Sequence, residues 1–195
     1  MPKSTNATGL SELLKTARAQ FLQWGYSGTS IASLAVELGV SKAALYYHFR
    51  DKEALFLGVF SEYLQTLQAD LGKIMPLFDG SDRKLALSTL ADIFLVEHPE
   101  SIQVQQLALQ ESRQLTQQGH EELSSLYHEN MVRPLSKLLQ NAELQGWFQP
   151  KESGNPDAIW VFLGLLTAFT PPYHVETADP IRTAAFVSML IKALN

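Results

Sequence analysis

The side chains with the most suggestive chemistry in this 195-residue sequence lie between positions 29 and 52. They are hydroxyl, amine, phenol and imidazole groups interleaved with two alanines: Thr29, Ser30, Ser41, Lys42, Ala43, Ala44, Tyr46, Tyr47, His48 and Lys52. Serine and lysine at the start of a helix suit a phosphate, because free backbone N–H groups and the helix dipole already favour an anion there. Alanine methyls can meet thymine methyls, and tyrosine hydroxyls can reach phosphates or bases. We therefore expect these residues to contact double-stranded DNA.

Two short helices are predicted to carry this surface. The first spans residues 31–38 with apolar residues at i, i+3, i+4 and i+7, and Thr29 or Ser30 can cap it. The second spans residues 42–49, and Ser41 can cap it. Gly39 permits a tight turn between the two helices, which gives the layout of a helix-turn-helix motif.

The helical angle sorts the residues of the second helix. At about 100° per residue, Tyr47 lies nearly opposite the inward-facing Leu45, with Ala43 beside it. Tyr46 and Tyr47 cannot both point inward on so short a helix, so we expect at least one to be exposed. His48 falls at the rim of the surface, where we expect packing rather than base reading.

The rest of the chain is predicted to be helical as well. Apolar residues recur at helical spacing without the sustained alternation of strands, so the expected fold class is all-α with about nine helices. The remaining helices are placed at residues 10–24, from 51 to at least 71, 82–97, 99–119, 120–145 with a kink at Pro134, 155–169 and 180–194. A side chain that can cap a helix precedes proline at Asn155-Pro156 and Asp179-Pro180. The expected domains are residues 1–55 and 56–195, with their boundary inside the continuous fourth helix.

Composition and charge narrow the classes of function. The net charge is −5, but residues 1–60 carry six basic and four acidic side chains, so the acidic excess lies in the remaining residues. No cysteine is present, which excludes disulfides, thiolate nucleophiles and Cys-ligated metals. No secretory signal is evident, and the apolar stretch at residues 159–169 is too short to span a bilayer. We expect a cytoplasmic protein.

Enzymatic and metal sites are not expected. The run 120–124 begins like a helical zinc motif, but Ser124 stands where the second histidine belongs. Neither a nucleophile elbow nor a glycine-rich phosphate loop occurs. The sequence therefore predicts no catalytic residues, no cofactor and no metal.

Residues 10–55 resemble the DNA-binding domain of the TetR family of transcriptional regulators. The shared features are Ala17 and Phe21, Gly25-Tyr26, Thr29-Ser30, Gly39-Val40-Ser41-Lys42, Leu45-Tyr46-Tyr47-His48-Phe49 and Lys52-Glu53. The resemblance implies a homodimeric, ligand-responsive regulator, usually a repressor, that binds a palindromic operator. It also implies phosphate contacts for Thr29 and Lys52. The chain departs from the family at Ala43, where glycine is frequent, and before the first helix, where Lys3 is the sole cation.

The resemblance further implies a ligand pocket enclosed by helices of the second domain. The side chains available there are mainly apolar and aromatic, which suits a small hydrophobic molecule. The candidate ligand-binding residues are Phe60, Tyr63, Phe94, Gln105, Tyr127, Met131 and Phe162. The same residues are also typical of a core without a ligand.

The last two predicted helices are candidates for the dimer interface. The stretch 159–169 is apolar on all sides, and a helix without a polar face must be covered all round. Small residues at Gly164, Ala168, Ala184 and Ser188 allow close approach of two backbones. We expect dimerisation through residues 155–169 and 180–194, although central core helices of a monomer would show the same pattern. The alternative for the whole chain is a helical small-molecule or protein-binding module without operator recognition.

Overall fold

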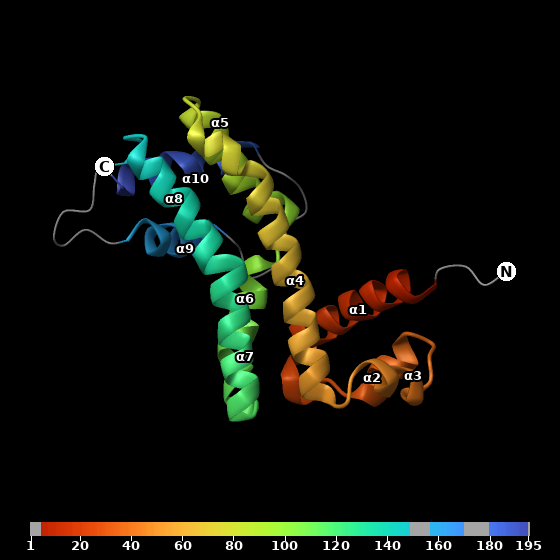
Figure 1. Ribbon diagram of the computed structural model, residues 1–195. Coiled ribbons are helices and arrows are strands. Elements are labelled where there is room, and N and C mark those ends of the chain that lie inside the picture. Colours follow the sequence, from red (N-terminus) through yellow and green to blue (C-terminus); the bar gives the residue numbers. More distant parts are fainter. Residues whose placement is uncertain (1–4, 149–156, 170–179, 195) are drawn as a thin grey trace. The chain divides into compact units, whose positions relative to one another are not determined.

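The computed structural model describes residues 5–148, 157–169 and 180–194, and no strand occurs in these ranges. Figure 1 labels its α-helices in chain order: α1 (Thr5–Gly28), α2 (Ile31–Glu37), α3 (Lys42–His48), α4 (Lys52–Ile74), α5 (Arg83–Asp92), α6 (Ser101–Glu111), α7 (Gln117–Tyr127), α8 (Arg133–Leu144), α9 (Ala158–Phe169) and α10 (Pro180–Ala193). Because α7 and α8 are two parts of one predicted helix, the expected all-α fold with about nine helices is confirmed. The predicted caps at Asn155 and Asp179, like Lys3 and Pro156, lie outside the described residues.

The described residues form two compact units. The first comprises residues 5–65 and 103–127, and the second comprises residues 66–102, 128–148, 157–169 and 180–194. Helices α4 and α6 therefore contribute residues to both units. The expected domain boundary near residue 55 stays a prediction.

Two glycines shape the N-terminal helices of the first unit. Gly25 breaks α1 with a φ of 69°, and Gly39 turns the chain between α2 and α3 with a φ of 63°. Other side chains strain at such positive φ values, so glycine is the residue that fits both positions. Ser30 caps α2 through a reciprocal hydrogen-bonded pair with Ser33. These local signals define the helix-turn-helix.

Aromatic packing fixes these helices on the first part of α4. The rings of Phe21 and Tyr26 both meet Phe56 edge to face, with centroids 5.0 and 5.1 Å from it. Phe49, at the end of α3, lies so close to Gly58 that a Cβ there would be 2.8 Å from its ring. The helix-turn-helix is therefore attached to α4 by a core rather than by a flexible linker.

Two helix boundaries differ from those expected. Helix α1 begins at Thr5 rather than near residue 10. The sixth helix ends at Glu111, followed by a 3-10 turn over Ser112–Gln114, and α7 begins at Gln117. Gly119, expected to terminate a helix, lies inside α7 and is buried. Because glycine has no side chain, the Glu53 carboxylate fits beside it.

Two π-helical turns interrupt the longer helices of the second unit. One covers Ile93–Glu97 at the end of α5, and the other covers His128–Val132 directly before α8. Pro134 lies in the first turn of α8. A proline inside a helix removes a hydrogen bond and clashes with the preceding turn, so the break expected at Pro134 takes the form of this π turn.

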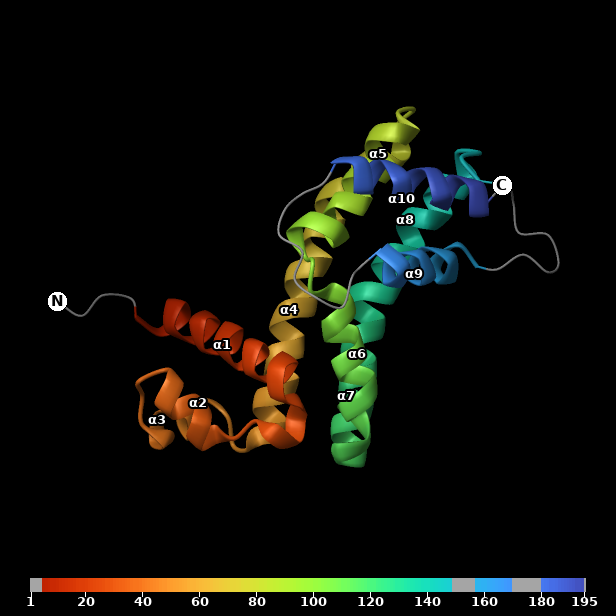
Figure 2. The ribbon, with the colours of Figure 1, turned by 180° about the vertical axis from the view of Figure 1, so that it is seen from behind.

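In the second unit α10 packs against both α9 and α5 (Figure 2), and α9 also packs against α8 and the π-helical turn Ile93–Glu97. The Phe162 ring lies between those of Phe94 and Phe186, with its centroid 5.2 and 5.3 Å from theirs. The Thr183 hydroxyl donates a 2.7 Å hydrogen bond to the Asp92 carboxylate. The opposite faces of both helices remain exposed, including large apolar side chains such as Trp160 and Ile181. None of the described helices has both the length and the apolar character required to cross a membrane.

Candidate nucleic-acid interface

Helix α3 presents its small and aromatic side chains to solvent. Tyr47 and Tyr46 are 83% and 53% exposed, whereas Leu45 is 1% exposed. The prediction that at least one tyrosine faces outward is confirmed, and both do. His48 is also exposed rather than packed inward, and its ring meets the Tyr47 ring edge to face at 5.2 Å. The Tyr47 and His48 rings are therefore packed against each other on the exposed face of α3.

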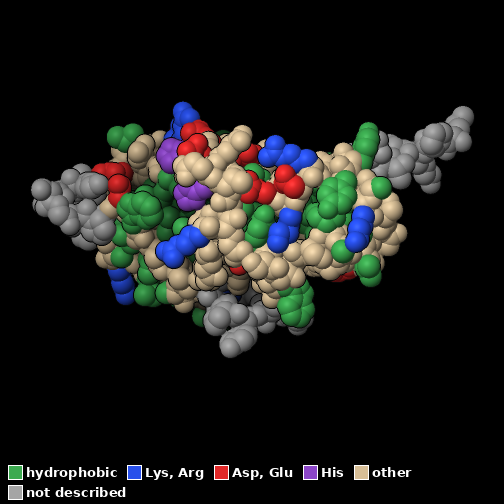
Figure 3. All heavy atoms as spheres, turned by 90° about the horizontal axis from the view of Figure 1, so that it is seen from below, with side chains coloured by type: hydrophobic (Ala, Val, Ile, Leu, Met, Phe, Trp, Pro, Cys, Tyr) green, Lys and Arg blue, Asp and Glu red, His purple; other side chains and the backbone are tan. Residues whose placement is uncertain are grey.

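The start of α3 has the geometry expected from the sequence. The Ser41 hydroxyl accepts a 3.1 Å hydrogen bond from the backbone N–H of Ala44, and Ser41 to Ala44 are all exposed. Figure 3 views the molecule from below, and on its right-hand part basic and apolar side chains stand side by side. The exposed residues of α3 thus include a cation, two alanine methyl groups and two phenol rings, the groups that were expected to contact DNA.

Two predicted phosphate contacts have structural roles as well. Thr29 is 1% exposed, and its hydroxyl donates to the carbonyl of Gly25 at 2.9 Å. The Lys52 ammonium donates to the carbonyls of Tyr26 and Thr29, at 2.8 and 3.3 Å, and lies 4.0 Å from the Tyr26 ring centroid. Both side chains therefore order the turn that precedes α2. Phosphate contacts by them stay predictions, and Lys52 retains some exposed surface for one.

The seven candidate ligand-binding residues divide between the two units. Phe60, Tyr63, Gln105 and Tyr127 belong to the first, and Phe94, Met131 and Phe162 belong to the second. All the aromatic and thioether members except Tyr127 are buried, and Tyr127 is partly so. Burial raises the pKa of Tyr127 to about 12. Among the described residues, the Tyr127 hydroxyl and Gln105 Oε1 are buried atoms without a hydrogen-bond partner.

Sequence reasoning missed a polar contact between the starts of α4 and α7. The Glu53 carboxylate accepts hydrogen bonds from the backbone N–H of Thr116 at 2.9 Å and from its hydroxyl at 2.6 Å. The Thr116 hydroxyl also accepts from the N–H of Gly119 at 3.1 Å. The first turn of α4 is thus bonded to the turn before α2 through Lys52 and to the start of α7 through Glu53.

This contact explains Gly119 and gives a testable result. A Cβ at Gly119 would overlap Glu53 Oε1 and lie 2.8 Å from its carboxyl carbon, so the carboxylate must move. Glycine-to-alanine changes in exposed helix interiors usually stabilise by about 1 kcal/mol. We expect Gly119→Ala to lack this gain because it breaks charge-assisted hydrogen bonds worth a similar amount. The measurement is the free energy of unfolding in denaturant.

Gly72 supplies the matched control for this experiment. It lies exposed in α4, and a Cβ there meets no atom within 4 Å, so Gly72→Ala should show the full gain. In a Glu53→Ala background, Gly119→Ala should become stabilising too. An equal gain from both alanines in the unmodified protein would contradict the contact.

These contacts define a helix-turn-helix motif in which buried side chains hold the exposed helix α3 in place. Residues 13–59 match the family model described as bacterial regulatory proteins, tetR family. The chain is 33% identical over 72 residues to the HTH-type transcriptional repressor Rv1474c of Mycobacterium tuberculosis, covering 35% of this chain and 38% of that protein. The chain spans 18–38% of the length of the curated relatives it matches.

Solved structures extend the likeness to the whole fold. The TetR family transcriptional regulator PfmR of Thermus thermophilus is 24% identical, with a TM-score of 0.70 over 94% of this chain and 98% of that chain. AibR, solved with isovaleryl coenzyme A and operator DNA, is 21% identical, with a TM-score of 0.70 over 94% and 98%. On these findings residues 13–59 match the tetR family model, and the described residues share the fold of solved TetR family regulators. The family and its named relatives are transcriptional regulators, not enzymes.

Proposed function

We propose that this protein is a transcriptional regulator, acting as a repressor, that binds a palindromic operator as a homodimer and is released by a small hydrophobic molecule. The observation that carries the proposal is the outer surface of α3. Tyr46, Tyr47 and the alanines before them are exposed on a helix whose inner side is fixed by Leu45 and Phe49. A rigid helix of this kind suits the major groove, which admits one α-helix.

The proposed dimer rests on the exposed faces of α9 and α10. Trp160 is 63% exposed and Ile181 is 80% exposed, while the small residues Gly164 and Ala184 are exposed between such side chains. Apolar surface of this kind on two neighbouring helices favours a second copy of the same helices. Two copies related by a twofold axis would present two α3 helices to a palindromic site.

The proposed release by a ligand has two supports. AibR was solved with an acyl coenzyme A, and the buried polar atoms of Gln105 and Tyr127 are available for hydrogen bonds from a ligand. The first turn of α4 supplies a connection, since Lys52 holds the turn before α2 and Glu53 holds α7. A ligand that favours the state with misplaced α3 helices would lower operator affinity.

Binding to the DNA flanking the protein's own gene tests the proposal. Fluorescence anisotropy should show specific binding relative to a scrambled duplex, with log affinity falling linearly as log salt rises. Hydrophobic compounds and isovaleryl coenzyme A are then screened by thermal shift, and those that stabilise the protein should reduce operator affinity. Absence of specific binding would leave the helical binding module as the function. Stabilising compounds without effect on DNA would contradict only the release mechanism.

A further inference from the structure

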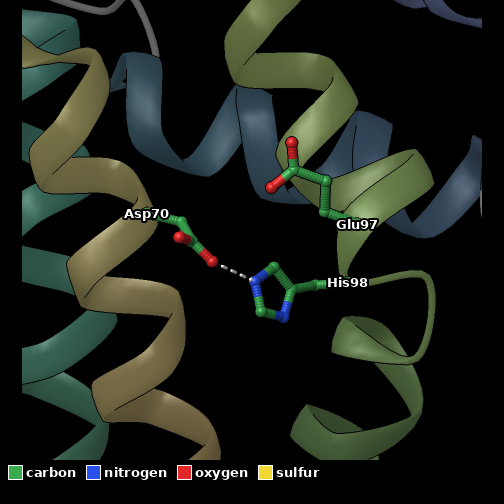
Figure 4. Close-up of side chains that lie close together, drawn as sticks. All are labelled: Asp70, Glu97 and His98. Carbon is green, nitrogen blue, oxygen red and sulfur yellow. Dashed lines mark hydrogen bonds and ion pairs between the residues drawn. The ribbon is translucent and has the colours of Figure 1, made fainter.

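Three side chains with metal-binding atoms meet in the second unit. Asp70 belongs to α4, and Glu97 and His98 come at the end of the π-helical turn that follows α5 (Figure 4). One ligand atom of each lies within 4.8 Å of the other two. His98 Nε2 is 2.9 Å from Asp70 Oδ2. One imidazole nitrogen and two carboxylates therefore lie near one another, although only Asp70 and His98 are in direct contact.

The backbone holds these residues in place. The N–H of His98 donates to the carbonyl of Ile93 at 2.8 Å, which closes the π turn, and Pro99 prevents further helix. The turn delivers two consecutive side chains, Glu97 and His98, toward α4. π-helical turns occur frequently at functional sites, because the extra residue redirects side chains that an α-helix would place elsewhere.

Burial and charge suit a cation at this point. His98 is 7% exposed, so its imidazole is positioned before anything binds. The Lys73 ammonium lies 2.6 Å from Asp70 Oδ1, but its side chain is 74% exposed and can withdraw into solvent. A positive charge already occupies the position beside Asp70.

We propose that Asp70, Glu97 and His98 bind a divalent transition-metal ion of the zinc class. Imidazole suits zinc, nickel, copper and iron, whereas an all-oxygen site would suit magnesium or calcium. Bonds of about 2.1 Å place tetrahedral ligand atoms about 3.4 Å apart. The Asp70–His98 pair must therefore open slightly, and the exposed Glu97 side chain must rotate inward. The neutral imidazole binds through Nε2, with its proton on Nδ1.

Three protein ligands leave the fourth position of a tetrahedral ion to water or to a ligand atom. Glu97 also lines a groove of about 840 Å³ between α5 and α10, together with Arg83, Lys84 and Thr183. Through Glu97 the cluster therefore borders a space large enough for a small molecule, next to the α10 face of the proposed dimer. The ion would also connect α4 to the end of α5, so binding should stabilise the second unit.

Zinc binding to the full-length, chelator-treated protein tests the proposal. Isothermal titration calorimetry should show one tight ion per chain, and cobalt should give the visible absorption bands of a site with nitrogen and oxygen ligands. His98→Gln and Asp70→Asn should each weaken binding by about tenfold or more. Lys73→Gln should strengthen it several-fold, since it removes a competing charge.

His128→Gln is the matched control, because His128 is exposed 3.3 Å from the Glu129 carboxylate but outside the three-residue cluster. It should leave zinc affinity unchanged. Circular dichroism of each variant verifies that the fold is retained. Unchanged affinity in His98→Gln, equal loss in His128→Gln, weaker binding in Lys73→Gln, or binding at millimolar zinc alone would each overturn the proposal.

Discussion

Gly164→Arg is expected to convert the protein from a dimer to a monomer and to lower operator affinity by about 100-fold or more, since two linked half-site contacts become one. Gly164 is exposed on α9, and a Cβ there meets no atom of the same chain within 4 Å. Arginine also favours helix over glycine by about 1 kcal/mol, so the single chain should tolerate it. Sedimentation velocity at micromolar concentration measures the change in mass.

Gly72→Arg provides the control for this substitution. Gly72 is likewise exposed and helical with no atom near its Cβ position, but it lies on α4 rather than on the proposed interface. That variant should remain dimeric and bind operator normally. A dimeric Gly164→Arg protein would place the interface elsewhere, and a monomeric unmodified protein would refute the dimer itself.

The second large effect is expected on α3, where loss of Lys42 should weaken DNA binding in general and loss of Tyr47 should weaken sequence discrimination. Lys42→Ala should weaken binding to specific and random DNA alike and reduce the slope of log affinity against log salt by about one. Tyr47→Ala should reduce discrimination among operator variants by about 1–3 kcal/mol, because its side chain is 83% exposed on the side opposite Leu45. Anisotropy titrations on cognate and random duplexes at several salt concentrations measure both.

Lys137→Ala is the control for Lys42→Ala. It also removes one cation, but from a residue far from the helix-turn-helix in the sequence. It should leave the salt slope unchanged. An equal loss on cognate and random DNA for Tyr47→Ala would assign Tyr47 to the phosphate backbone. An unchanged slope for Lys42→Ala would show that its ammonium makes no phosphate contact.

Local signals in the sequence were sufficient for the helix-turn-helix. Ser30 and Ser41 cap the helices they were expected to cap, and Gly39 has the positive φ that its turn requires. The angle around α3 correctly separated the inner Leu45 from the outer Tyr47. Each of these features depends on residues within four positions of one another, which is why a single sequence reveals them.

Features that depend on distant residues were not predictable in the same way. Local rules predict that Gly119 ends a helix, but it lies inside α7, and the absence of a side chain leaves room for Glu53, 66 positions earlier in the sequence. The Asp70–His98 pair likewise joins residues 28 positions apart, and the π turn that aims His98 has no distinct periodicity. The sequence pattern instead favoured His120 as the metal candidate, because residues 120–124 begin like a local zinc motif.

The candidate ligand-binding residues illustrate a third limit. Phe94 and Phe162 are fully buried, and the centroids of their rings lie 5.2 Å apart. Either a core or the wall of a pocket would have this arrangement. Composition cannot separate the two, since both consist of apolar and aromatic side chains. Polar atoms without partners, such as those of Gln105 and Tyr127, are more informative and become visible only with the fold.

Selection of binding sites from a random DNA library tests the central claim most directly, because the operator sequence need not be known for it. The purified full-length protein should enrich an inverted repeat whose half-site centres lie about 34–36 Å, or a multiple of that distance, apart along the duplex. The Tyr47→Ala variant should enrich a more degenerate repeat with the same spacing. Failure of the unmodified protein to enrich any repeat, or an identical motif from both proteins, would contradict operator recognition by α3.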